Sequence, residues 1–272
     1  MWEEWCEGCG GASSEEESKL LLLCWLGDMS VKGWSVAKLN RVLAGVAFGL
    51  KWRRLPDLTK DFVVAQAVRG FRRGRSTRDT RWPVGFQLLE RLGEVVDGIC
   101  RSPYEAALFR LAFVFAFFGA LRIGELVAPS GSKLGGLLRT DVEVYPGRVE
   151  FWVRKSKTDQ AGAGRKVVLG QLSGSGVCPV RCLESYLRVR LDGALPLLCH
   201  ADGSYLSRYQ FTAIFRRGLS FLGLDPSRFA PHSFRIGAAT EAASWGLGAE
   251  VVKKIGRWDS DRYRGYIRPH WV

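Results

Sequence analysis

Two segments near the end of the chain indicate the fold: Ala230-Pro-His-Ser-Phe-Arg235 and Gly256-Arg-Trp-Asp-Ser-Asp-Arg-Tyr-Arg-Gly-Tyr266. The first segment places a histidine and an arginine three residues apart, so both side chains share one face of a helix. The second segment adds a tryptophan and two tyrosines. The planar guanidinium of arginine matches phosphate oxygens, and a tyrosine hydroxyl can act as a nucleophile. These residues together predict a site that reacts with phosphate groups.

The bulk composition indicates a folded protein that interacts with polyanions. The chain has 272 residues, 47% of them hydrophobic, which predicts one large or two modest domains with a substantial core. A formal net charge of +13 favours nucleic acid first and anionic membrane surfaces second. The apolar runs at 20–26 and 111–121 are shorter than the roughly 20 residues of a membrane-spanning helix. We therefore expect no membrane anchor.

Seven cysteines, an odd number in a long chain, indicate free thiols and an intracellular, reducing compartment. Cys6 and Cys9 form a single CxxC, and a looser group consists of Cys178, Cys182, Cys199 and His200. Neither group has the paired spacing of a zinc module. The sequence therefore predicts no metal and no cofactor.

The first part of the chain is predicted to form a small helical bundle. Residues 1–18 show no period and are predicted to be an irregular tail, and residues 19–73 are predicted to form an all-α domain. Its last helix, at 58–71, is expected to turn Phe62, Val63, Ala65, Val68 and Phe71 inward. Residues 74–83 are rich in arginine and small polar side chains, which is typical of a basic interdomain linker.

Residues 84–272 are predicted to form a larger domain that is mainly α-helical with a small three-stranded antiparallel sheet. Short runs of alternating or β-branched residues at 139–145, 148–153 and 165–169 predict the strands. Ser207 and Gly223 are expected to begin and end one of the helices. Helical spacing predicts helices at 86–96, 104–118, 180–191, 206–221, 232–245, 248–255 and 261–267.

Two upstream segments carry further candidates for the site. Arg122 follows a nearly apolar helix, where an arginine is costly unless it is paired or faces a cleft, and Glu125 lies three residues beyond it. Lys155 and Lys157 follow the middle predicted strand, in the loop that leads to the third.

The order Ala-Leu-Arg122-Ile-Gly-Glu125, Ser-Lys157-Thr, Pro-His232-Ser-Phe-Arg235, Gly-Arg-Trp258 and Tyr266-Ile-Arg resembles the tyrosine recombinases, the phage-integrase family. The resemblance covers about residues 85–268. Each segment alone occurs by chance in many proteins, whereas all five in this order are specific. The resemblance implies the tyrosine-recombinase catalytic fold for the larger domain, and the preceding bundle is similar to the family's core-binding domain.

The resemblance also implies how the residues act. Tyr266 would attack a scissile phosphate of DNA and form a 3′-phosphotyrosyl intermediate. Arg122 and Arg235 would hold the two non-bridging oxygens of that phosphate. Lys157 would protonate the departing 5′ oxygen, with Lys155 as the alternative because the register of a hairpin is uncertain in sequence.

The remaining site residues would assist these steps. His232 would donate to a phosphate oxygen or help to take the tyrosine proton, and Trp258 would donate a hydrogen bond from its indole N–H. Glu125 would brace the site, or form a plain surface salt bridge. Tyr263, one helical turn before Tyr266, is the competing nucleophile.

The function implied is cleavage and rejoining of DNA strands, with double-stranded DNA as partner, self-association on DNA, and no membrane or small-molecule substrate. The alternatives are a domesticated, non-catalytic DNA-binding protein and an enzyme similar to type IB topoisomerases. The sequence around Trp258 and Tyr266 is similar to that of recombinases of DIRS-like or Crypton-like mobile elements, which would place the protein in a nucleus. The residues expected to contact DNA are basic side chains of the bundle and linker: Lys51, Arg53, Arg54, Arg69, Arg72, Arg73, Arg75, Arg78 and Arg81.

We expect binding to duplex DNA to weaken steeply with salt, because phosphate contacts release counterions. Each neutralised phosphate contributes about −0.9 to the slope of log affinity against log salt concentration. Replacement of Arg69, Arg72 and Arg73 by alanine should make this slope shallower in fluorescence-anisotropy titrations. An unchanged slope would contradict the assignment of these arginines to DNA.

Overall fold

The computed structural model describes residues 12–74, 79–130, 135–154 and 164–268, with residues 4, 7, 8 and 10 besides. The chain divides into two compact units, residues 1–79 and 80–272. Within the described residues no helix has the length and apolar character required to cross a membrane. Several residues singled out in the sequence lie outside the described part: Cys6, Cys9, Arg75, Arg78, Lys155 and Lys157.

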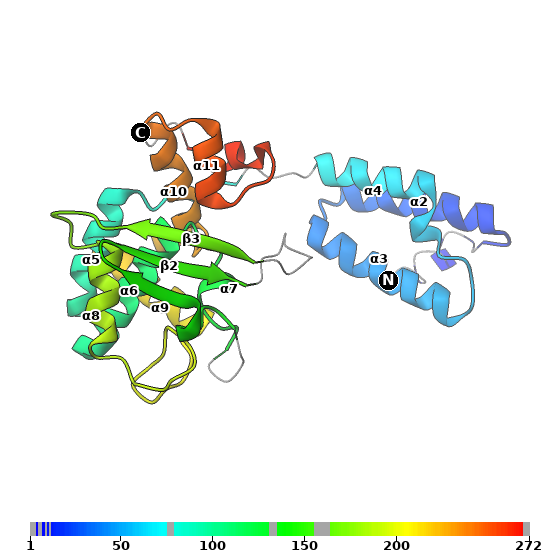
Figure 1. Cartoon of the computed structure of the whole chain (residues 1–272). Coiled ribbons are helices and arrows are strands. Elements are labelled where there is room, and N and C mark those ends of the chain that lie inside the picture. The colour runs from blue at the N-terminus through cyan, green and yellow to red at the C-terminus, as the bar shows by residue number, and fades with distance from the viewer. Residues whose placement is uncertain are drawn as a thin grey trace. The chain divides into compact units, whose positions relative to one another are not determined.

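The described part of the first unit is helical (Figure 1). Its first long helix begins at Glu15, inside the segment predicted to be an irregular tail. Ser14 Oγ accepts the N–H of Glu17 at 3.1 Å, and three glutamates in the first turn complement the positive end of the helix dipole. The elements are α2 (Glu15–Val31), α3 (Val36–Trp52), the 3-10 turn η1 (Leu58–Lys60) and α4 (Phe62–Gly74).

The buried face of α4 differs in part from the prediction, since Val68 and Phe71 turn inward as expected and Phe62 and Val63 do not. Phe62 and Val63 are 73% and 56% exposed, because the helix turns Val64, Val68 and Phe71 inward at positions i, i+4 and i+7. These three side chains join the core of the unit, which α2 supplies with Leu22, Trp25, Leu26 and Met29 and α3 with Leu39 and Leu43.

The second unit is built around α6 (Pro103–Phe118). Ser102 caps this helix by accepting the N–H of Glu105 at 3.2 Å, and Pro103 occupies the first turn, where its missing N–H costs nothing. As predicted from its apolar sequence, most of its residues are buried, including the whole run from Leu111 to Phe117. The helices α5 (Phe86–Ile99), α8 (Pro179–Leu187) and α9 (Arg208–Phe221) pack against it.

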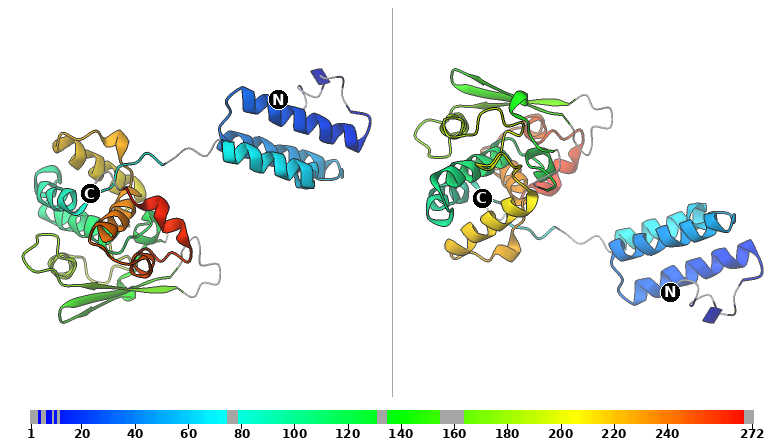
Figure 2. Two further views of the ribbon diagram at one scale, coloured as in Figure 1. Left: turned by 90° about the horizontal axis from the view of Figure 1, so that it is seen from above. Right: turned by 90° about the horizontal axis from the view of Figure 1, so that it is seen from below.

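A three-stranded antiparallel sheet, as predicted, forms one outer layer of this unit (Figure 2). The strands are β1 (Val142–Tyr145), β2 (Arg148–Val153) and β3 (Arg165–Gly170), with β2 in the middle. β1 begins later than expected because residues 139–141 form the 3-10 turn η2 (Arg139–Asp141). Phe151 of β2 stacks on Phe115 of α6 with ring centroids 5.1 Å apart, which fixes the sheet against the central helix.

The predicted limits of α9 agree with the structure, whereas the predicted end of α8 does not. Ser207 and Gly223 begin and end α9 as expected: Ser207 caps it, and Gly223 takes φ of +72°. In contrast, α8 stops at Leu187 and does not continue to residue 191. The buried guanidinium of Arg190 donates to the carbonyls of the following loop, including Leu197 at 3.0 Å, which draws the chain out of the helix.

Four phenylalanines lock the helix that carries His232 and Arg235 onto the central helix. Phe234 of α10 (Ser233–Ser244) lies 5.5 Å from Phe113 of α6, 5.7 Å from Phe211 and 4.8 Å from Phe215, as ring centroids. Close aromatic pairs of this kind stabilise beyond the area that they bury. The start of α10 is therefore held by residues next to the proposed site. The turn η3 (Pro226–Arg228) precedes it, and α11 (Ala249–Gly256) and the 3-10 turn η4 (Asp261–Tyr266) follow.

The chain enters this unit by crossing α10. Trp82 donates its backbone N–H to Arg228 O at 2.8 Å, and Val84 donates to Ser233 O at 3.0 Å. The end of the segment predicted to be a linker is therefore packed on the unit. Gly237 permits this crossing, because a Cβ there would lie 1.7 Å from Val84 O.

We expect Gly237→Ala to lower the free energy of unfolding by about 1–3 kcal/mol or more, because the methyl group overlaps the Val84 carbonyl. Gly98 in α5 is the matched control, since a Cβ there meets open space. Gly98→Ala should leave stability unchanged or raise it by about 0.5–1 kcal/mol through helix propensity. Equal urea-unfolding midpoints for the two variants would contradict the close approach.

Candidate active site

Arg122 lies at the turn where the central helix ends. Gly119 closes α6, Ala120 adopts the left-handed region with φ of +42°, and Arg122 is the N-cap of the short helix α7 (Ile123–Leu126). Glu125 accepts from Arg122 twice, from its backbone N–H at 2.9 Å and from its guanidinium at 2.8 Å. The carboxylate is buried, so this pair is not a plain surface salt bridge. It holds Arg122 in one orientation.

Arg235 is fully buried and joins three segments of the chain. Its guanidinium donates to Ala120 O and to Gly256 O, each at 2.5 Å. Burial, together with the charges of Arg122 and Arg257, lowers the pKa of Arg235 to about 10. That value is well above neutrality, so the group stays charged. Its Nε is buried and has no hydrogen-bond partner among the described residues.

The ring of Tyr266 is surrounded by three of the predicted site residues. His232, the N-cap of α10, lies 5.1 Å from it and Trp258 lies 4.9 Å from it, measured between ring centroids. The guanidinium carbon of Arg235 is 5.5 Å from the Tyr266 ring and 4.3 Å from the Trp258 ring. Figure 1 shows that the elements carrying these residues, α10, α11 and the red η4 turn, lie together.

Gly256, two residues before Trp258, leaves the space that the indole ring occupies. A Cβ on Gly256 would lie 1.7 Å from the indole ring, so only glycine lets the ring fold back over the end of α11. The indole Nε1 is buried without a hydrogen-bond partner in the described part of the chain. A buried, unpaired donor is costly, and a bound acceptor would remove that cost.

Tyr263, the competing nucleophile, occupies a different environment. It is 6% exposed and packs with Ala239, Ala242 and Val252 in a small apolar cluster. Tyr266 is only partly buried and packs at the edge of this cluster. Of the two rings, Tyr266 is the one that lies against His232.

Arg257 is a site residue that the sequence interpretation missed. It is 8% exposed and donates to Gly119 O at 2.6 Å, to Ala120 O at 3.3 Å and to Glu125 Oε2 at 2.8 Å. Burial lowers the pKa of this guanidinium, and the Glu125 carboxylate opposes the change. A buried arginine has no signature in the sequence, where Arg257 looks like one more basic residue of a basic chain.

The charges of the site do not balance. Arg122 and Arg257 both pair with the carboxylate of Glu125, and Arg235 lies close enough to these two guanidinium groups for their charges to lower its pKa. Buried charges of one sign favour the binding of an opposite charge. The arrangement is therefore suited to an anion such as a phosphate diester.

The basic residues predicted to contact DNA lie in the first unit or just after it. Lys51, Arg53 and Arg54 are exposed at and after the end of α3, and Arg69, Arg72 and Arg73 are exposed along α4. Arg72 donates to Asn40 Oδ1 at 2.8 Å. Arg81 is partly buried.

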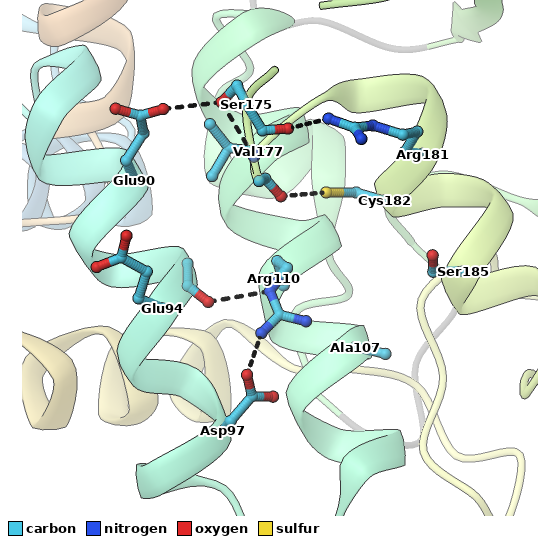
Figure 3. Close-up of a pocket in the computed structure, with 12 residues that line it drawn as sticks. Glu90, Glu94, Asp97, Ala107, Arg110, Ser175, Val177, Arg181, Cys182 and Ser185 are labelled. Atoms are coloured by element: carbon cyan, nitrogen blue, oxygen red, sulfur yellow. Dashed lines mark hydrogen bonds and ion pairs between the residues drawn. The ribbon is translucent and has the colours of Figure 1, made fainter. Parts of the chain in front are cut away.

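A cavity of about 530 Å³ lies elsewhere in the second unit, between α5, α6 and α8 (Figure 3). Its charged groups are largely engaged with the protein: Arg110 pairs with Asp97 at 2.5 Å, and Glu90 accepts from Ser175 at 2.9 Å. It contains none of the predicted site residues. The described residues include no group of histidine, cysteine and acidic side chains arranged to hold a metal ion.

Comparison with known proteins places this geometry in context. No protein-family model matches the chain. An integrase/recombinase xerD homolog of Selenomonas ruminantium is 25% identical to it over 273 residues, which cover 96% of this chain and 76% of that protein. The chain is a homologue of this integrase/recombinase.

Solved structures of tyrosine recombinases show that this homologue has their fold. The XerH site-specific recombinase, in a post-cleavage complex with palindromic difH substrate, matches with a TM-score of 0.60 at 16% identity. A lambda integrase dimer bound to a COC′ core site matches with a TM-score of 0.59 at 14% identity. The matches cover 92% and 93% of the homologue but only 66% and 65% of those two chains.

We expect Glu125→Gln to lower the free energy of unfolding of the homologue by about 3–5 kcal/mol, because buried Arg257 would lose its counter-charge while the shape is kept. Urea denaturation provides the measurement. Glu150 is the matched control: it also accepts from two cations, Arg148 at 2.9 Å and Lys166 at 2.5 Å, but both are about half exposed. Glu150→Gln should cost much less, and equal losses would contradict the role of burial.

Proposed function

We propose that this chain cuts and rejoins strands of duplex DNA through a covalent phosphotyrosyl link at Tyr266. The observation that carries the proposal is the position of the Tyr266 ring, in contact distance of His232, Trp258 and the guanidinium of Arg235. A nucleophile, fixed positive charge and a hydrogen-bond donor thus meet at one point. These are the groups that attack on a phosphodiester without a metal requires.

The attacking atom in this mechanism is the phenolic oxygen of Tyr266. It forms a bond to the scissile phosphorus as the bond to the 5′ oxygen breaks, so the energy of the phosphodiester is kept in the 3′-phosphotyrosyl link. His232 is near enough to the Tyr266 ring to help take its proton or to donate to a phosphate oxygen. A 5′-hydroxyl then reverses the reaction and restores the strand without ATP.

Arg122 and Arg235 would neutralise the non-bridging oxygens, where charge builds up in the transition state. In the structure the rings of Tyr266 and Trp258 cover Arg235, which is fully buried. Contact with phosphate therefore requires the Tyr266 ring to move off the guanidinium. The unpaired Arg235 Nε and Trp258 Nε1 are the donors that the phosphate would satisfy.

The departing 5′ oxygen needs a proton, and Lys157, with Lys155 as the alternative, is proposed to supply it. Both lie outside the described residues, between β2 and β3. In sequence they follow the end of β2, and Arg165, the first residue of β3, pairs with Asp259 at 2.5 Å. That ion pair ties the start of β3 to the residue after Trp258, on the side of the site.

The first unit is proposed to act as a core-binding domain whose basic side chains hold the DNA backbone, and the protein is proposed to self-associate on DNA. Support comes from the exposed arginines of α4 and from the DNA-bound state of the XerH and lambda integrase structures. An origin in a mobile element and an intracellular, nuclear location are further proposals. Both proposals rest on the resemblance of the sequence around Trp258 and Tyr266 to mobile-element recombinases.

We expect a nicked suicide duplex, cut near its cleavage point, to trap a covalent protein–DNA adduct on denaturing gels. Tyr266→Phe should abolish the adduct, because the nucleophilic oxygen is lost. Tyr263→Phe is the matched control. It also removes a tyrosine hydroxyl, but from a residue one turn before Tyr266 that packs in the apolar cluster.

Adducts that persist in Tyr266→Phe would overturn the choice of nucleophile. A wild-type protein that binds DNA and forms no adduct on any duplex would favour a non-catalytic DNA-binding protein.

A further inference from the structure

We infer that Arg257 is a positioning residue for the strand-cleavage reaction: it holds Arg122 and Arg235 in the relative placement that receives the phosphate. This inference rests on the proposed function and assigns a role to a residue that does not touch the substrate. It would act through Glu125 and through the carbonyls of the turn between α6 and α7.

The hydrogen bonds of Arg257 converge on the groups that place the two clamping arginines. Arg257 donates to Glu125 Oε2 at 2.8 Å, and the same carboxylate accepts from the backbone and the guanidinium of Arg122. Arg257 also donates to Ala120 O, the carbonyl that accepts from Arg235 at 2.5 Å. The guanidinium of Arg257 therefore shares one hydrogen-bond acceptor with Arg122 and another with Arg235.

The backbone of Arg257 reinforces this placement. The carbonyl of the preceding residue, Gly256, accepts from Arg235 at 2.5 Å, and the following residue is Trp258. Arg257 itself has φ of +55° at the end of α11, a conformation that favours glycine. A residue other than glycine keeps this conformation where its surroundings hold it, and the buried contacts of the Arg257 side chain supply that hold.

Lysine could not replace these contacts. The guanidinium fork reaches a carboxylate and two carbonyls at once, from two different nitrogens, whereas an ammonium group is a single point of donation. Arg257→Lys would keep the charge next to Glu125 and lose the bonds to the turn. Arg257→Met would lose both.

Arg190 is a matched control for the loss of a buried arginine. It is also 8% exposed and also donates to backbone carbonyls, among them Leu191 O and Leu197 O at 3.0 Å. Its partners lie in the loop after α8, and within the described residues its hydrogen bonds reach none of the site residues. Arg190→Met should disturb folding to a similar degree without changing the clamp.

The test compares two suicide duplexes in single-turnover cleavage, one with the natural scissile phosphate and one with an uncharged methylphosphonate. Arg257→Met should slow cleavage of the phosphate about 10²-fold or more, as expected when one oxyanion donor is misplaced. On the methylphosphonate, which has less charge to neutralise, its deficit relative to wild type should shrink at least about tenfold. Arg122→Ala should behave in the same way, and Arg257→Lys should lie between Arg257→Met and wild type.

A purely structural role predicts a different result. Misfolding lowers the active fraction and slows both substrates by one factor, as expected for Arg190→Met. The inference is overturned if Arg257→Met cleaves the phosphate like wild type, or if it loses the same factor on both substrates.

A measurement without DNA separates this inference from the proposed function. The Nε–Hε signal of Arg122 in NMR should be shifted and slow to exchange in the wild type and in Arg190→Met, and should collapse toward free arginine in Arg257→Met. An unchanged signal in Arg257→Met overturns the positioning role, even in a protein that forms no adduct. Absence of a wild-type adduct with the collapse present would refute the cleavage function and support the placement of Arg122 by Arg257.

Discussion

The buried guanidinium of Arg235 is the constraint on which the second unit depends. It connects the turn after the central helix to the end of α11 through Ala120 O and Gly256 O, residues that are far apart in the sequence. A buried cation without compensation is very costly, so its surroundings must supply acceptors and a counter-charge. The carbonyls of Ala120 and Gly256 are the acceptors, and the carboxylate of Glu125 supplies the counter-charge. The fold around the site follows from satisfying that one group.

The compensation stops short of neutrality, and this shortfall links structure to function. Arg122 and Arg257 both pair with Glu125 and Arg235 adds a third charge nearby, while Arg235 Nε and Trp258 Nε1 remain unpaired in the described part of the chain. Without a ligand, the rings of Tyr266 and Trp258 cover the guanidinium of Arg235 and recover part of the cost through cation–π contact. A phosphate that displaces the Tyr266 ring would satisfy the donors. Binding and exposure of the nucleophile would then be one event.

Close backbone approaches make this geometry possible. Gly237 lets the entering chain cross α10 at Val84, and Gly256 lets Trp258 fold over the end of α11. The phenylalanine cluster around Phe234 then fixes the start of α10, so that the neighbouring Arg235 has little freedom. The rigidity of the site comes from the packing beneath it, as electrostatic preorganisation requires.

The sequence by itself determined most of the elements and the resemblance to a family. Helical and strand periodicities are local, so the mainly α fold, the three-stranded sheet and the apolar central helix could be predicted, and the order of the motifs pointed to the tyrosine recombinases. Tertiary structure decided which charges are buried. Arg257 and the exposed arginines of α4 look alike in sequence, because burial depends on contacts with Gly119, Ala120 and Glu125, more than a hundred residues away. The same reason explains Phe62 and Val63: periodicity shows that a helix has a face, and only the packing of the bundle selects which residues turn inward.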